Sequence, residues 1–168
     1  MGLHCTKSDD ILVNIRKNRK HKIVRYRGKK IIQEVYKDKS NNLIFRKGAY
    51  VLMLAENNNG DICVSDLNAE LVVVVNRKGG VRFRYDGAQA KRRKSFDPRC
   101  IVTDFRSQII VTDVYNGCLH ILDQNGSLLR CVDNCGLYRP YGLCLDDKGR
   151  LWVGLPMTNE IKVIEYQT

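Results

Sequence analysis

Short apolar runs separated by polar turns make up most of the chain. The runs are about four to seven residues long and rich in β-branched residues, which is typical of strands. In the clearest stretch they cover residues 100–104, 108–113, 118–123 and 127–132. Asn125 and Gly126 separate the last two runs, and both residue types tolerate the positive φ of a tight hairpin. No stretch shows the spacing and caps of a helix, so the pattern predicts an all-β protein.

The strand pattern repeats along the chain. Residues 59–66 align with 106–113 and with 148–155, at offsets of 47 and 42 residues. Pro98 and Pro140 obey the second offset, as do Asp104 and Asp146. A repeat of this length with four short antiparallel strands is typical of one blade of a β-propeller.

The units resemble NHL repeats, which carry a Pro at the start, a strand closed by Asp, an Asn and an outer hairpin. The matching residues are Pro98, Asp113, Asn116 and Gly126. The similarity is greatest to the C-terminal propeller of tripartite-motif NHL proteins, in the form common in molluscs. It rests on DICVSDLNAELVVVVNRKGGVRFRY, HILDQNGSLLRCVDNC and PYGLCLDDKGRLWVG, and covers most of residues 50–168 and, more weakly, 10–36. Ala69, where Asn is usual, and Gly154-Leu155 depart from the pattern.

The predicted fold is a partial NHL-type β-propeller of about three to four four-stranded antiparallel blades, an open fragment of a six-bladed ring. The expected parts are an N-terminal tail (1–9), an incomplete blade without its inner strand (10–36), a connection (37–49), two blades (50–86 and 98–132) and a last, three-stranded blade (139–166). We expect Thr168 to be the natural C-terminus and residue 1 to lie inside the parent ring. A closed four-bladed ring is the alternative.

Positive charge is distributed unevenly. The chain has 29 Lys and Arg against 18 Asp and Glu, a formal net charge of +11. Residues 1–50 carry fourteen basic and four acidic residues, and a second basic cluster covers residues 91–94. Such an asymmetry indicates either a polyanionic partner or a solvated face.

Motifs for catalysis are absent from the sequence. It has no G-x-S-x-G, no H-E-x-x-H and no phosphate-binding glycine loop. His4 and His21 lie in the basic segment, and a structural role is expected for His120. The seven Cys are expected as free thiols, and Cys131 and Cys135 lack the further ligands of a zinc site. We therefore predict no enzymatic activity, no cofactor and no metal, with a metal-dependent propeller hydrolase or lyase as an alternative.

Loops on one face of the predicted propeller form the candidate binding surface. They cover residues 67–70, 89–99, 114–117, 134–141 and 156–159. Guanidinium groups pair with phosphate and aromatic rings stack on unpaired bases. The candidate contacts for RNA or a protein partner are Lys91, Arg92, Arg93, Lys94, Phe96, Arg139 and Tyr141. The structural repeat positions are Asp66, Asp113, Pro98, Pro140 and Asn116, and the two Asp are expected to accept hydrogen bonds from loop N–H groups.

The resemblance implies a non-catalytic recognition module, which binds protein or RNA for a RING-type ubiquitin ligase. The RING finger, B-boxes and coiled coil of such a ligase are absent from this sequence, and a pure protein-interaction scaffold is the alternative. The sequence shows no signal peptide and no apolar run of membrane length, so a cytoplasmic protein without a membrane partner is expected. Residues 1–6 also fit the myristoylation pattern at Gly2, for which an accidental match is the alternative.

Overall fold

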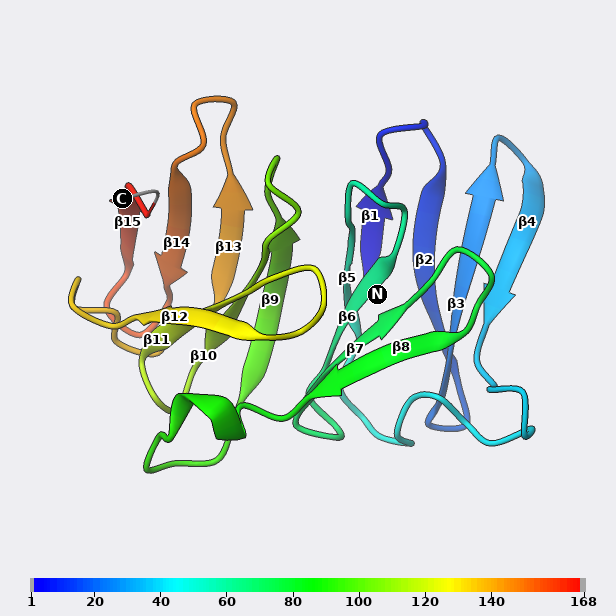
Figure 1. Ribbon diagram of the computed structural model, residues 1–168, viewed down its shortest axis with the longest axis horizontal. Helices are drawn as coiled ribbons and strands as arrows, with labels where there is room; N and C mark the ends of the chain where they lie inside the picture. Colours follow the sequence, from blue (N-terminus) through cyan, green and yellow to red (C-terminus); the bar gives the residue numbers. More distant parts are fainter. Residues whose placement is uncertain (1, 167–168) are drawn as a thin grey trace.

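The computed structural model describes residues 2–166, which form four antiparallel sheets (Figure 1). The first sheet holds β1 (Leu3–Cys5), β2 (Ile11–Lys17), β3 (Lys20–Arg27) and β4 (Lys30–Val35), and the second holds β5 (Met53–Glu56), β6 (Ile62–Asp66), β7 (Leu71–Val75) and β8 (Val81–Tyr85). The third holds β9 (Pro98–Thr103), β10 (Ile109–Asp113), β11 (Cys118–Leu122) and β12 (Leu128–Val132), and the fourth holds β13 (Gly142–Leu145), β14 (Leu151–Leu155) and β15 (Glu160–Ile164). Within the described residues, helix is limited to the 3₁₀ turn η1 (Ala88–Ala90). No helix in this part of the chain has the length and apolar character needed to cross a membrane.

The four sheets stand side by side around a common axis. The first strands of successive sheets are neighbours, with β1 next to β5, β5 next to β9, and β9 next to β13 (Figure 1). The row begins at β1 and ends at β13, so the sheets form an open arc. This is the fan of thin sheets that the sequence repeat predicts.

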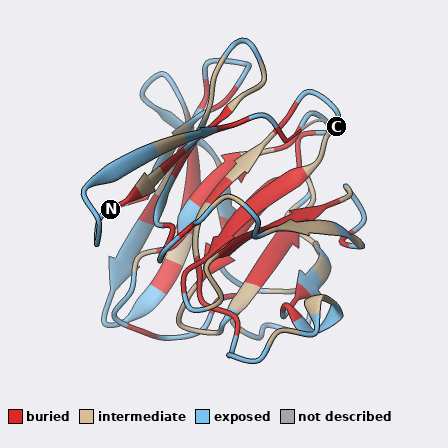
Figure 2. Cartoon of the chain, turned by 90° about the vertical axis from the view of Figure 1, so that its left-hand side faces the viewer, coloured by how far each residue is buried: buried red, intermediate tan, exposed pale blue. Residues whose placement is uncertain are grey.

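Each gap between neighbouring sheets is filled by its own apolar core. Leu12 and Ile62 belong to the first core, Val74 and Ile109 to the second, and Leu119 to the third. β6, β10 and β11 are buried along their whole length because a neighbouring sheet covers each of their faces (Figure 2). A single sheet of this kind cannot hide both of its apolar faces, so the sheets depend on one another for stability.

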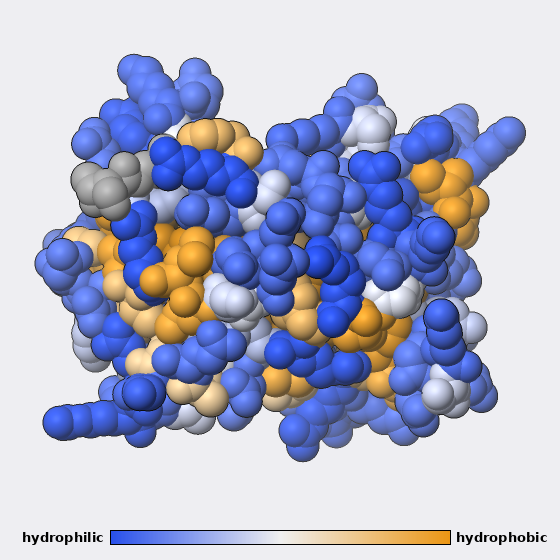
Figure 3. Space-filling view, in the orientation of Figure 1, coloured by the Kyte–Doolittle hydropathy of each residue, from blue (hydrophilic) through white to orange (hydrophobic). Residues whose placement is uncertain are grey.

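The two ends of the arc expose apolar side chains. Ile11 and Ile15 lie on the uncovered face of the first sheet, whereas Trp152, Ile161 and Val163 lie on that of the fourth. In the view of Figure 3 hydrophobic surface is also present as separate patches between hydrophilic side chains. The uncovered faces agree with the predicted open fragment of a ring.

The first sheet differs from the prediction, because it has an inner strand. Leu3–Cys5 pairs antiparallel with β2, so the predicted tail over residues 1–9 and the missing inner strand are wrong for these residues. His4 Nε2 accepts the Glu56 N–H at 3.1 Å and ties β1 to β5. Gly2 is buried against the carbonyl group of Leu52, so the residue named by the acylation pattern is packed inside the fold. Three residues are too few for period-2 alternation to show in the sequence.

The repeated aspartates of the hairpin turns have a common structural role. Asp104 Oδ1 accepts the N–H groups of residues 106 and 108, at 2.9 and 2.7 Å. Asp146 Oδ1 accepts those of residues 148 and 150, at 3.0 and 2.9 Å. A carboxylate that accepts backbone N–H groups two and four residues ahead stabilises a tight turn. The 42-residue spacing of Asp104 and Asp146 therefore reflects equivalent turns in successive sheets.

Candidate functional site

Seven connections lie at the same end of the strands and form one surface, which we call the loop face (Figure 1, toward the lower ends of the strands). They consist of residues 18–19, 36–52, 67–70, 86–97, 114–117, 133–141 and 156–159. The sequence predicted five of these segments. The structure adds the β2–β3 turn and the β4–β5 connection, because the first sheet is oriented like the others.

The loop face is strongly basic. Its seven segments contain ten of the 29 Lys and Arg residues and five of the 18 Asp and Glu residues. The turns at the opposite end of the strands, residues 6–10, 28–29, 57–61, 76–80, 104–108, 123–127 and 146–150, contain seven basic and seven acidic residues. The fold therefore sorts a dispersed positive charge onto one end of the molecule, where its field attracts polyanions.

Five tyrosines are exposed on the loop face. The exposed fractions are 40% for Tyr36, 55% for Tyr50, 46% for Tyr115, 59% for Tyr138 and 49% for Tyr141. Of these, only Tyr141 was a candidate from the sequence. Tyr115 and Tyr138 lie inside loops that the sequence did assign to this face, so their aromatic character in those loops was the available signal.

A central hollow of about 320 Å³ lies where β5, β9 and β13 begin, and Tyr50, Arg99 and Tyr141 line it. The Arg99 guanidinium is 5.5 Å from the centre of the Tyr50 ring and 5.3 Å from that of Tyr141. Arg99 Nε donates to Asp97 Oδ1 at 3.0 Å, which fixes the guanidinium between the rings. The cation–π contacts hold both tyrosines in place and leave part of each ring open to solvent.

A second, outer hollow of about 510 Å³ lies between the β10–β11 and β12–β13 loops. Its lining includes Lys94 and Arg139, which are exposed, together with Tyr115 and Tyr138. The two cations can pair with phosphate groups, and the two open aromatic rings can stack on bases.

Asn116 holds the basic loop in place. Its Oδ1 accepts the Lys94 N–H at 3.1 Å, and its Nδ2 donates to the Lys94 carbonyl at 3.1 Å and to Asp113 Oδ2 at 2.7 Å. Asn68 makes the same pair of bonds to Tyr50, at 3.0 and 2.9 Å. The Asn of the repeat is therefore present in the second sheet too, one residue before Ala69.

The repeat aspartates, at the ends of β6 and β10, anchor connections of the loop face. Asp66 Oδ2 accepts the Arg46 N–H at 3.0 Å, and Asp113 Oδ1 accepts the Asp97 N–H at 3.3 Å. Pro98 begins β9 opposite Asp113, and the buried Pro140 precedes β13. The aspartate contacts link the second and third sheets to the connections that enter them.

The sequence-predicted contact residues do not all reach the surface. Lys91, Arg93, Lys94, Arg139 and Tyr141 are exposed on the loop face.

Two of the predicted contacts face inward instead. Arg92 is half-buried and pairs with Asp133 at 2.7 Å. Phe96 is 5% exposed, with its ring 5.5 Å from Tyr85 and 5.0 Å from His120, so the expected stacking of a base on Phe96 is wrong. The loop turns back over the sheet after η1, and a large apolar ring gains more from burial there than from exposure.

A buried cluster of ionisable side chains lies beneath the basic loop. His120 is fully buried, with Nδ1 2.8 Å from the Tyr85 hydroxyl and Nε2 3.2 Å from Asp113 Oδ2. Burial alone lowers the pKa of His120, but Asp113 and Cys131 together raise it above its ordinary value. The Cys118 thiol, with smaller contributions from His120 and Arg92, lowers the pKa of Cys131. A structural role was expected for His120 from the sequence, which did not indicate that it lies next to the two cysteines.

No protein-family model and no curated protein sequence matches the chain. Solved structures do match. A streptogramin B lyase structure has a TM-score of 0.68 at 19% sequence identity, over 100% of this chain and 55% of that chain. Virginiamycin B lyase from Staphylococcus aureus has a TM-score of 0.69 at 18% identity, over 100% and 56%. The WD40 β-propeller domain of Doa1 has a TM-score of 0.66 at 16% identity, over 98% and 50%.

The fold is a β-propeller. Its four sheets are blades, and the loop face is one end of the propeller. The chain spans about half the length of the structures that it matches. At this level of identity the likeness establishes the fold and says nothing about chemistry.

Proposed function

We propose that this propeller is a non-catalytic recognition module that binds single-stranded RNA on its loop face. The difference in charge between the two ends of the propeller carries the proposal: ten basic and five acidic residues at one end, seven of each at the other. Phosphates of an RNA strand attract such a surface at any sequence, and exposed tyrosines supply stacking platforms for its bases.

The two hollows suggest how an unpaired strand is held. In the outer hollow, Lys94 and Arg139 pair with phosphates while Tyr115 and Tyr138 stack on bases. In the central hollow, Arg99 is already partnered by Asp97, so its part is to position the rings of Tyr50 and Tyr141. Stacking on aromatic rings tolerates any base, so we expect affinity for single strands with modest sequence preference.

The resemblance to tripartite-motif NHL proteins supports a more specific role. We propose that the chain is the NHL propeller of a cytoplasmic ubiquitin ligase of that class, and that it selects what the ligase acts on. The three matching stretches and the structural role of Asp113 and Asn116 support this. Sequencing the complete transcript tests it: an upstream RING finger in the same reading frame supports the assignment, and a transcript that encodes no RING contradicts it.

RNA binding is tested by charge neutralisation at matched positions. Lys94→Gln with Arg139→Gln removes two exposed cations from the loop face, and Lys78→Gln with Lys148→Gln removes two from the opposite end. Each double variant changes the net charge by the same amount. Binding of a fluorescently labelled single-stranded oligouridylate is followed by anisotropy over a range of salt concentrations.

We expect the loop-face variant to bind more weakly, with the slope of log K against log salt reduced by about 1.4, at about 0.7 for each lost phosphate contact. The opposite-face variant should keep the wild-type slope. An equal loss of RNA affinity in both variants would show that only the net charge of the protein matters, and it would contradict a specific binding surface. Absence of RNA binding, with salt-insensitive capture of a protein partner, would favour the scaffold alternative.

A further inference from the structure

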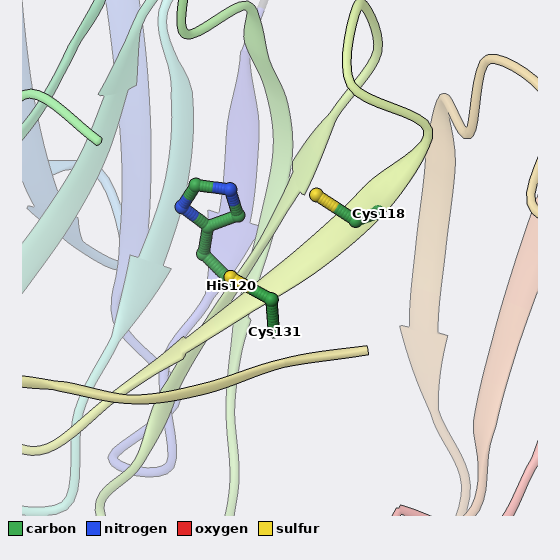
Figure 4. A group of neighbouring side chains, drawn as sticks. All are labelled: Cys118, His120 and Cys131. Atoms are coloured by element: carbon green, nitrogen blue, oxygen red, sulfur yellow. The ribbon is translucent and has the colours of Figure 1, made fainter. Parts of the chain in front are cut away.

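Three metal-binding side chains converge on one face of the third blade. Alternation along β11 places Cys118 and His120 on the same face, and the β11–β12 register places Cys131 directly opposite His120. The two sulfur atoms and an imidazole nitrogen all lie within 4.8 Å of one another (Figure 4). The three residues come from adjacent strands of one sheet, whose ladder fixes their backbone positions.

The imidazole is oriented as a ligand by its neighbours. His120 Nδ1 is 2.8 Å from the Tyr85 hydroxyl, and the ring stacks on Phe96 at 5.0 Å between centres. Nε2 is buried and has no hydrogen-bond partner among the described residues, although Asp113 Oδ2 lies 3.2 Å away without the alignment of a hydrogen bond. A ligating His commonly donates its second N–H to such a fixed partner, which leaves the other nitrogen free for a metal.

The donor set selects the metal. Two thiolates and one imidazole are soft and borderline ligands, which favour Zn²⁺ over hard cations such as Mg²⁺ or Ca²⁺. Two thiolates also cancel the charge of one Zn²⁺, so the ion, the two thiolates and the imidazole together carry no net charge, which suits a buried position. Arg92 is the cation next to Cys131, and its charge is offset by Asp133 at 2.7 Å.

We propose that Cys118, His120 and Cys131 form a zinc site between β11 and β12, with a fourth position filled by water or by the Asp113 carboxylate. Binding deprotonates the two thiols and releases two protons to solvent, and Zn²⁺ keeps its oxidation state. The sulfur and nitrogen atoms have to draw together by up to about 1 Å to reach tetrahedral ligand distances. The ion would cross-link the two outer strands of the blade directly beneath the basic loop.

Metal titration of the whole chain tests the site. Co²⁺ in place of Zn²⁺ should give a thiolate-to-cobalt charge-transfer band and the visible bands of a tetrahedral complex, at one ion per chain. Addition of Zn²⁺ should abolish these bands and raise the unfolding temperature, and EDTA should reverse the rise. Cys131→Ser should lose the charge-transfer band, and Tyr85→Phe should weaken binding by about 10- to 100-fold because it frees the imidazole.

Matched variants separate this site from ordinary cysteines. Cys63→Ser replaces a thiol in the second blade that is as buried as that of Cys118, and Cys144→Ser replaces an exposed one, so both should bind Co²⁺ like the wild type. Because a buried ligand variant can fail to fold, alkylation of the wild-type chain gives a second readout. Zn²⁺ should protect Cys118 and Cys131, located by peptide mass spectrometry, and leave Cys144 reactive. A spectrum without thiolate bands, or bands that survive Cys131→Ser, would overturn the proposal.

Discussion

Replacing Asn116 by Ala should loosen the basic loop without changing any charge. The substitution removes the bond to Asp113 Oδ2 at 2.7 Å and the two bonds to the backbone of Lys94, both at 3.1 Å. Asp113 stays buried and loses a donor. A hydrogen bond to a charged group contributes about 1.5–3 kcal/mol, and a neutral one about 0.5–1.5 kcal/mol. Asn116 is partly exposed, so water replaces some of these bonds, and we expect a net loss of about 3 kcal/mol.

The assay is urea unfolding followed by tryptophan fluorescence and circular dichroism, with the RNA titration on the same samples. For a chain of this size, a loss of about 3 kcal/mol in the free energy of unfolding corresponds to a fall of about 6–12 °C in Tm. RNA affinity should fall as well, because Lys94 is no longer held at the rim of the outer hollow.

Two further variants make the result specific. Asn68→Ala removes the equivalent clamp on Tyr50 and should destabilise by a similar amount, while leaving the Lys94 loop intact. Gln124→Ala removes an exposed amide and should stay within about 0.5 kcal/mol of the wild type. If Asn116→Ala behaves like Gln124→Ala, the clamp does not position the loop and the reasoning is refuted.

Three other substitutions test the packing between blades and the turns. Leu119→Ala, at a fully buried position of the third core, should cost about 2–5 kcal/mol in chemical denaturation, and a loss below 1 kcal/mol would mean that this core is loosely packed. Hydrogen bonding to Arg27 lowers the pKa of the buried Asp10 in the folded protein. The wild type should therefore be more stable than Asp10→Asn above pH 3.8, and this difference should disappear as the pH falls through the lowered pKa of the folded state. If the two proteins lose stability equally with acid in thermal melts, this reasoning is contradicted. Gly126→Ala should lower the unfolding temperature, because φ is +91° there and a Cβ would meet the ring of Phe83; an unchanged melt would show that the β11–β12 turn can adapt.

The local elements could be predicted from the sequence because the information for them is local. Apolar runs of strand length alternate with Asn-Gly and Asp-containing turns, and the Asp side chains fold each turn through bonds to N–H groups two and four residues ahead. The 42-residue spacing then predicts equivalent sheets, and the repeated Asp113 and Asn116 predict how a loop is anchored. β1 could not be predicted, because its three residues are held by pairing with β2 and by the contact of His4 with Glu56. Both interactions depend on the assembled fold.

The candidate surfaces were decided by the tertiary structure. Charge along the chain indicates an imbalance, but only the strand directions show that basic segments as distant as residues 18–19 and 86–97 share one end of the propeller. Phe96 could be predicted to lie in a basic loop, and its ring turns inward because burial against Tyr85 and His120 stabilises it more than exposure.

The sequence by itself determined the strands, the turns and their repetition, since each depends on residues a few positions apart. Only the tertiary structure decided which side chains meet across strands and between blades. Cys118, His120 and Cys131 share one face because the register of β11 and β12 aligns them. That register cannot be predicted from the spacing of the three residues along the chain.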